Sequence, residues 1–180
     1  MSAVTRARAA PAAPALPIGE LPKKVLSDVR YFRNAPGGRG RLRMDIADAS
    51  SWERSFEALI NLHSARWQAS NQAGVLSDPD VLAWHHEAIP LLQAADCLRL
   101  YVLDVIANQL RALYALVDPP ARSLRTEYFY LIGYSPVHAH LKPGTLPTAM
   151  ASEQAAGAGV RVIDMLRGNE PYKNSGTWRR

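Results

Sequence analysis

The run from Glu127 to Tyr134 restricts the fold of this chain more than any other feature of its sequence. It reads Glu-Tyr-Phe-Tyr-Leu-Ile-Gly-Tyr, and aromatic and β-branched residues of this kind favour a β-strand. A polar connection with a proline follows at 135–144, and residues 145–156 then show the pattern of a helix that ends at two glycines. The C-terminal half of the chain must therefore place a strand before a helix.

Apolar periodicity divides the rest of the chain into further helices and strands. The predicted elements, in chain order, are a strand at 42–46, a helix at 52–67, a helix from Asp78-Pro79 to Leu92, strands at 98–106 and 110–117 joined by a tight turn at 107–109, the strand at 127–134, the helix at 145–156 and a terminal strand at 160–166. This order predicts a mixed α/β (α+β) domain and excludes a helical bundle and a β-sandwich.

The two predicted N-terminal helices begin at recognisable caps. Ser50 precedes Glu53 by three residues, which is the spacing of a capping box. Asp78 precedes Pro79, a cap followed by the residue that suits the first helical position. Pro90 lies inside the second helix, so we expect a kink or a split there.

Composition is that of one globular domain after a short lead. The chain has 180 residues, of which 48% are hydrophobic and 21% charged. Residues 1–19 are rich in alanine and proline and predict a disordered lead, whereas 20–180 predict a single domain. No apolar run reaches the length of a membrane span. Cys97 is the only cysteine, which excludes an internal disulfide and favours the cytoplasm.

The segment 20–43 carries most of the excess positive charge of a chain whose formal net charge is +5. One interpretation is a solvated helical face. The other is contact with phosphate or RNA, because basic clusters bind anionic backbones.

Polar side chains arrive together just after the terminal strand: Asp164, Arg167, Glu170, Tyr172 and Lys173. Ligands of open α/β sheets lie beyond the carboxyl ends of strands, so this cluster predicts the edge of a site. Two purely structural alternatives stay open, namely an ion pair between Asp164 and Arg167 and a packing role for Tyr172.

A second candidate site lies at the start of the helix that follows the 127–134 strand. Lys142-Pro-Gly-Thr145 offers free backbone N–H groups, a glycine for close approach and the positive end of a helix. These are the requirements of a pyrophosphate site, although many helices begin in the same way for structural reasons alone.

Together, these motifs resemble the GNAT-fold acyltransferases, and more narrowly the branch described as BioF2-like or CelD-like acetyltransferase domains, relatives of the Fem-type aminoacyl transferases. In that branch a helix after a Pro-Gly-Thr-like turn precedes a strand that ends in Asp-Phe-Leu-Arg-Gly, followed by Glu-x-Tyr-Lys. This chain has Asp164-Met-Leu-Arg-Gly168 and then Glu170-Pro-Tyr-Lys173. Leu62-His-Ser-Ala-Arg-Trp67 and Leu21-Pro-Lys-Lys24 also resemble the family, and the likeness spans about residues 20–178.

The resemblance implies a mostly antiparallel sheet flanked by helices and a CoA thioester as acyl donor, acetyl-CoA or another acyl-CoA. The strand with Leu131 and Gly133 would pair with the pantetheine arm, and its main-chain N–H groups would polarise the thioester carbonyl. Lys142, Gly144 and Thr145 would hold the pyrophosphate. No metal is implied.

The same resemblance implies transfer to an amine of a small molecule or sugar. Glu170, or else Asp164, would take the amine proton as general base, and Tyr172 could protonate the leaving thiolate. Arg167 and Lys173 would hold an anionic substrate or the cofactor phosphates.

Members of this branch carry a longer N-terminal half and further strands after the terminal one, which leaves alternatives to an active enzyme. The chain would then be a truncated, inactive remnant that serves as a binding module. An aminoacyl-tRNA-dependent transferase, with segment 23–43 on the RNA, is the other alternative. An incomplete sheet would also leave an edge through which a homodimer could form.

Overall fold

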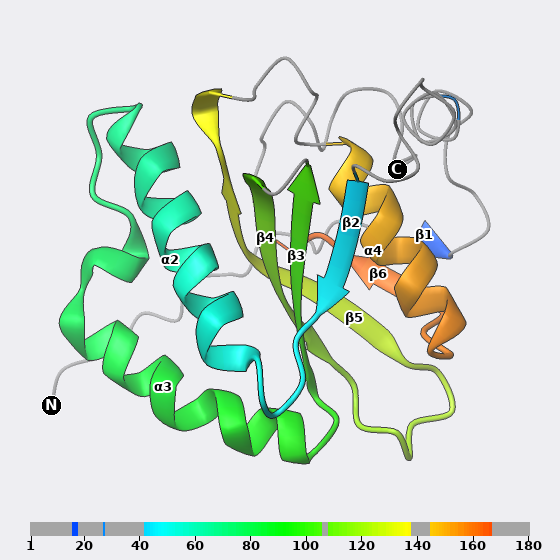
Figure 1. Ribbon diagram of the computed structural model, residues 1–180. Coiled ribbons are helices and arrows are strands. Elements are labelled where there is room, and N and C mark those ends of the chain that lie inside the picture. Colours follow the sequence, from blue (N-terminus) through cyan, green and yellow to red (C-terminus); the bar gives the residue numbers. More distant parts are fainter. Residues whose placement is uncertain (1–15, 18–26, 28–41, 106–107, 138–144, 167–180) are drawn as a thin grey trace, which may run out of the picture.

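The computed structural model describes residues 16–17, 27, 42–105, 108–137 and 145–166, drawn in colour in Figure 1. Its elements are β1 (Leu16–Pro17), β2 (Leu42–Ile46), α2 (Trp52–Gln68), a 3₁₀ turn (Val75–Ser77), α3 (Pro79–Ala94), β3 (Leu98–Val105), β4 (Asn108–Val117), β5 (Thr126–Tyr134), α4 (Thr145–Gly157) and β6 (Val162–Asp164). The predicted order of strand, two helices, three strands, helix and strand is confirmed from β2 to β6.

Two boundaries differ from the prediction. Val105 pairs with Asn108, so the β3–β4 connection is 106–107 instead of the predicted 107–109. The terminal strand is confined to Val162–Asp164, shorter than its apolar pattern indicates. A third difference lies in the lead, where Leu16 and Pro17 form β1 against β6 although the composition of 1–19 predicts disorder.

The capping box predicted for Ser50 and Glu53 at the start of α2 is wrong. The side chain of Asp48 instead accepts hydrogen bonds from the Ser50 N–H at 2.9 Å, the Ser50 hydroxyl at 2.8 Å and the Ser51 hydroxyl at 2.7 Å. These hydrogen bonds lower the pKa of Asp48 to about 2. Ser51, at the N-cap of α2, makes no side-chain bond to the helix. Both serine hydroxyls donate to this charged acceptor, which forms stronger hydrogen bonds than a neutral one.

The second cap is confirmed: Asp78 accepts from the Asp80 N–H at 2.9 Å, and Pro79 takes the first position of α3. The split expected at Pro90 does not occur, because α3 continues to Ala94. Pro90 itself is exposed, while Ile89 beside it is buried in the core. Packing on one side thus holds the helix together across the missing hydrogen bond.

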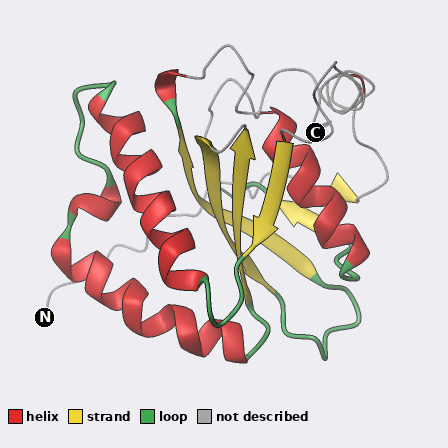
Figure 2. Ribbon diagram, in the orientation of Figure 1, coloured by secondary structure: helices red, strands yellow, loops and turns green. Residues whose placement is uncertain are grey.

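The strands form one sheet in the order β1-β6-β5-β4-β3-β2. All neighbouring pairs are antiparallel except β5 and β6, which are parallel. Helices α2 and α3 lie on one face of this sheet and α4 on the other, as Figures 1 and 2 show. The predicted mixed, mostly antiparallel sheet flanked by helices is therefore confirmed.

The two faces of the sheet are packed differently. On the α2–α3 face the core is built from large side chains such as Phe56, Leu59 and Ile89. On the α4 face the helix contributes Ala151 and Ala155, which pack against larger residues of the strands. Small residues let the α4 backbone approach the sheet closely, so the strands supply most of the buried volume on that side.

Gly133 brings α2 directly onto β5. A Cβ at this position would lie 2.6 Å from the backbone nitrogen of His63 and 2.8 Å from Cβ of Leu62. Atoms do not approach this closely, so any side chain here would push α2 off the strand. Among the described residues, no helix is long and apolar enough to cross a membrane.

Candidate active site

Strands β5 and β6 run side by side over three residue pairs and then separate. The parallel pairs are Thr126 with Val162, Glu127 with Ile163 and Tyr128 with Asp164. Strand β6 ends at that point, whereas β5 continues to Tyr134. Within the described part of the chain, no strand pairs with β5 beyond Tyr128 on this side. The sheet therefore opens at the carboxyl ends of two parallel strands, where ligands of such sheets bind.

A β-bulge lies at the start of this opening. Tyr114 pairs with Leu131 but its neighbour Ala115 pairs with Phe129, so Tyr130 is an extra residue in β5. Both Tyr130 and Leu131 face α2 and α3: Tyr130 contacts the ring of His85, and Leu131 packs against the core of that face. Bulges redirect side chains and backbone next to active sites, and no pattern in the sequence indicated this one.

The register settles which main-chain groups of β5 face the opening. The Ser135 N–H donates to the Leu110 carbonyl at 2.9 Å. Alternation in an antiparallel ladder then directs the main-chain groups of Leu131 and Gly133 toward β4 and those of Ile132 and Tyr134 toward the open side. Leu131 and Gly133, which the sequence singled out, thus line this segment, but their neighbours Ile132 and Tyr134 present the main-chain groups on the open side.

Arg66 reaches the open edge from α2. Its Nη1 donates to the Ile132 carbonyl at 3.3 Å, and its guanidinium lies 5.4 Å from the ring centre of Tyr134 and 5.3 Å from that of Trp67. The stacked guanidinium places a fixed positive charge beside the opening. Sequence reasoning included this arginine in a family-like segment but assigned it no role.

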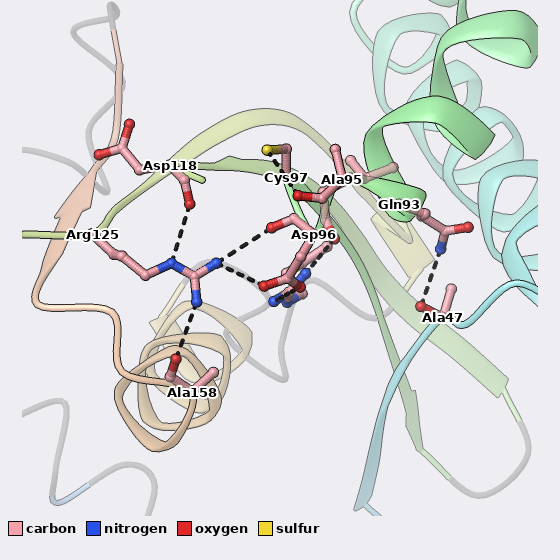
Figure 3. A network of polar contacts seen from close by, with 10 residues as sticks. Ala47, Gln93, Ala95, Asp96, Cys97, Asp118, Arg125 and Ala158 are labelled. Carbon is pink, nitrogen blue, oxygen red and sulfur yellow. Dashed lines mark hydrogen bonds and ion pairs between the residues drawn. The ribbon is translucent and has the colours of Figure 1, made fainter. Parts of the chain in front are cut away.

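The opposite end of the β5–β6 pair is closed by a polar network (Figure 3). The Arg125 guanidinium donates to the Asp118 carbonyl at 3.1 Å, the Ala158 carbonyl at 3.4 Å, and the carbonyl and carboxylate of Asp96 at 3.3 and 3.0 Å. Arg99 adds a further bond to Asp96. Partial burial raises the pKa of Asp96, but the bonds and charges of both arginines lower it more. This network ties the turns before β3, β5 and β6 together.

Glu127 is a buried carboxyl in the paired part of β5, one residue before the strands separate, and the sequence did not reveal it as unusual. It lies on the α4 face of β5, and neither carboxyl oxygen has a well-formed hydrogen bond to the described residues. Burial raises the pKa of Glu127 to about 7, against the lowering effects of the nearby Tyr101 hydroxyl and of the Arg99 and Arg125 charges. Glu127 can therefore hold a proton near neutral pH.

Two further predicted site residues lie within the described chain. Asp164 is the last residue of β6, and its Oδ1 accepts the Leu166 N–H at 2.8 Å in a turn where Leu166 has φ of 51°. Thr145 is the first residue of α4. The remaining candidates lie outside the described residues: Lys142, Gly144, Arg167, Glu170, Tyr172 and Lys173. The structure thus places Asp164 at the point where the two strands separate.

Comparison with known proteins agrees with this geometry. Residues 23–174 match the family described as Acetyltransferase (GNAT) domain. No curated protein matches the chain in sequence.

Several solved structures share the fold at low sequence identity. One is an aminoglycoside acetyltransferase from an uncultured soil metagenomic sample, in complex with sisomicin (14% identity, TM-score 0.53, 76% of this chain and 84% of that chain). A second is a predicted acetyltransferase with acetyl-CoA from Clostridium acetobutylicum (11%, TM-score 0.52, 77% and 90%). A third is FemX (9%, TM-score 0.61), of which this chain spans about half, 89% of this chain covering 52% of that one.

Proposed function

The chain belongs to the acetyltransferase (GNAT) domain family, and on this premise we propose that it transfers the acetyl group of acetyl-CoA to an amine of a sugar or another small molecule. The observation that carries the proposal is the separation of β5 from β6 directly after Tyr128 and Asp164, with a bulge at Tyr130. It leaves a strand edge that pairs with no other strand among the described residues, at the place where an extended ligand can add to a sheet.

In this proposal the pantetheine arm of acetyl-CoA lies along the open edge of β5. Ile132 and Tyr134 offer the main-chain groups for pairing, while Leu131 and Gly133 hold that edge in place against β4 and α2. Arg66 now bonds to the Ile132 carbonyl and would have to release it to a cofactor amide. The loop with Lys142 and Gly144 and the start of α4 at Thr145 would receive the pyrophosphate.

The chemical step moves one acetyl group and one proton. The amine nitrogen attacks the thioester carbonyl carbon, a C–N bond forms, and the C–S bond breaks. A carboxylate takes the amine proton, and the thiolate leaves as free CoA after it is protonated. Glu170 and Asp164 are our candidates for the base and Tyr172 for the acid, with Arg167 and Lys173 on anionic groups of the ligands.

Thermal melting with increasing acetyl-CoA tests the proposal. We expect stabilisation that grows with acetyl-CoA or CoA concentration and does not appear with ATP. Gly144→Asp should abolish it, because the new carboxylate would repel the pyrophosphate. A turnover assay that follows the release of free thiol in the presence of an amine completes the test. A folded protein that shows neither a shift nor thiol release would contradict the proposal and favour the inactive binding module.

One alternative enzyme class shares the fold. The likeness to FemX supports an aminoacyl-tRNA-dependent transferase as the second candidate function, with segment 23–43 as the RNA contact. RNA binding whose affinity falls steeply with salt would favour it, because phosphate contacts release counterions. The cytoplasm, where acetyl-CoA is available, is the proposed location. A homodimer through an unpaired sheet edge remains a prediction.

A further inference from the structure

His85 is a buried histidine whose ring nitrogens are both without a partner in the described structure. Its side chain is 1% exposed, and neither Nδ1 nor Nε2 is hydrogen-bonded to any described residue. Leaving a buried polar group in this state destabilises the folded chain, so native proteins keep few of them. In the sequence, His85-His-Glu87 forms only an incomplete metal motif, since Pro90 stands where a second ligand would be required.

Aromatic rings surround this imidazole. The ring centres of Trp84, Tyr114, Phe56 and Tyr130 lie 4.8, 5.2, 5.6 and 6.1 Å from that of His85. The hydroxyl of Tyr114 is likewise buried and unpartnered among the described residues. Three polar atoms without partners thus gather at one place on the α2–α3 face of the sheet. Burial and the neighbouring His86 lower the pKa of His85, which keeps the ring neutral at pH 7.

Two of the surrounding rings are open to solvent. Trp84 on α3 is 57% exposed and Tyr130 on β5 is 44% exposed, although large aromatic side chains are usually buried. Both contact His85, one from α3 and the other from β5. We call these two exposed rings, together with the His85 that both contact, the aromatic platform.

The aromatic platform lies next to the place where the acetyl group is expected. Tyr130 is the extra residue of the bulge and stands two positions beyond Tyr128, the last residue of β5 that pairs with β6. The donor would approach along the open edge of β5, while the platform covers the α2–α3 face of the same residues. An acceptor on the platform could therefore meet a thioester held at the bulge.

We propose that the aromatic platform is the acceptor subsite and that it binds an amino sugar, with the ring of the sugar on Trp84 and Tyr130 and its polar groups toward His85 and Tyr114. This inference rests on the proposed acetyl transfer. The C–H groups of a sugar ring carry positive partial charge and suit the negative faces of the aromatic rings. An ammonium group is attracted to the same faces by a cation–π interaction. The unpartnered nitrogens of His85 and the Tyr114 hydroxyl are buried, so they would bond hydroxyl and amine groups of the sugar once the rings of Trp84 and Tyr130 move aside to admit them.

The test is a calorimetric binding titration of the full chain and its variants with glucosamine, with NMR at the indole N–H signal of Trp84 in the wild type to locate the site. Glucose, which has the ring and hydroxyls but no amine, is the ligand control. We expect glucosamine to shift the Trp84 signal and glucose to bind at least tenfold more weakly. Trp84→Ala should weaken glucosamine binding at least tenfold, and Trp84→Phe should recover part of it. Leu91→Ala is the matched control, because Leu91 is 73% exposed on the same helix and lies off the platform.

A second variant separates a polar role of His85 from a packing role. His85→Phe keeps a ring of similar size and removes both unpartnered nitrogens. We expect glucosamine binding to weaken severalfold while the melting temperature stays the same or rises. Unchanged binding in His85→Phe would remove the polar part of the proposal. Binding in Trp84→Ala equal to that of the wild type, or no binding by the wild type, would overturn it entirely.

Acetyl-CoA binding, measured separately by melting, keeps the two proposals distinguishable. If Trp84→Ala loses glucosamine but keeps its stabilisation by acetyl-CoA, both proposals are supported. Wild-type protein that binds acetyl-CoA but does not bind glucosamine would overturn the acceptor subsite alone. Wild-type protein that binds glucosamine on the platform but not acetyl-CoA would support the subsite and contradict acetyl transfer.

Discussion

The two ends of β5 differ in how fully their polar groups are satisfied. At the Thr126 end, the strand pairs on both sides and the Arg125 network joins three turns. At the Tyr134 end, one edge is unpaired among the described residues. A bulge turns Tyr130 toward His85 and Tyr114, whose buried polar atoms have no hydrogen-bond partner among the described residues. The Arg125 network stabilises the Thr126 end, where the buried Glu127 carboxyl is an exception without a well-formed hydrogen bond, and the candidate site lies at the Tyr134 end.

Of the variants proposed here, Gly133→Ala should lower the free energy of unfolding the most. The new Cβ would lie 2.6 Å from the backbone nitrogen of His63, and backbone cannot yield as a side chain can. We expect a loss of about 3 kcal/mol in the free energy of unfolding, measured by urea denaturation. Gly157→Ala is the control, because its Cβ would meet nothing within 4 Å. Equal stability of the two variants would mean that α2 does not pack directly against Gly133.

Glu127→Gln should change how stability depends on pH. The pKa of Glu127 is about 7 in the folded chain and 4.5 in the reference state. Between these values the unfolded chain has released the proton and the folded chain keeps it, so wild-type stability falls as pH rises through this window. The variant should match the wild type below pH 4.5 and exceed it above pH 7 by up to about 3 kcal/mol.

The free energies of unfolding of Glu127→Gln and of the wild type must be compared at each pH. Burial lowers the pKa of His63 to about 4 from 6.5, so His63 makes stability rise with pH over nearly the same window. Subtracting the two unfolding curves removes the histidine contributions, which are common to both proteins. A difference that does not change with pH would show that Glu127 is not protonated in the folded chain.

Arg125→Met should loosen the closed end. It removes bonds to Asp118, Ala158 and Asp96 from a partly buried guanidinium, and we expect a loss of about 2 kcal/mol in the free energy of unfolding. Arg122→Met is the matched control, since Arg122 is 68% exposed and lies 3.9 Å from Asp118. That variant should lose less than about 1 kcal/mol. Comparable losses would mean that the network adds nothing beyond a surface ion pair.

Asp164→Asn should have the smallest effect on stability and separates structure from catalysis at the open end. An asparagine oxygen can still accept the Leu166 N–H, so we expect a change within about 0.5 kcal/mol. Asp164→Ala loses that bond and should cost about 1 kcal/mol. If Asp164 is the general base, the Asn variant keeps its fold and loses turnover. If Asp164 only fixes the turn, turnover survives in Asn and the base is to be sought at Glu170.

Sequence patterns predicted the elements well because those signals are local. The β5 strand, the α3 cap at Asp78 and the helix from Thr145 were each foreseen from neighbouring residues. Where a local pattern failed, a competitor decided the outcome: the Asp48 carboxylate displaced the expected Ser50 cap, and packing carried α3 through Pro90. Of the candidate site residues, Asp164, Thr145, Leu131 and Gly133 lie in the described structure, and the roles of all the candidates stay predictions.

The sequence by itself determined the mixed α/β order, the strand–helix–strand unit at the C-terminal end and the resemblance to an acyltransferase family, because periodicity, caps and motifs are written in adjacent residues. Only the tertiary structure decided that β5 and β6 separate after three residue pairs and that α2 packs directly against Gly133. The ring contacts of Tyr114 with His85 and with Tyr130 were also decided there. Those features join residues from different elements, and contacts between distant segments are set by packing and register, which no local pattern encodes.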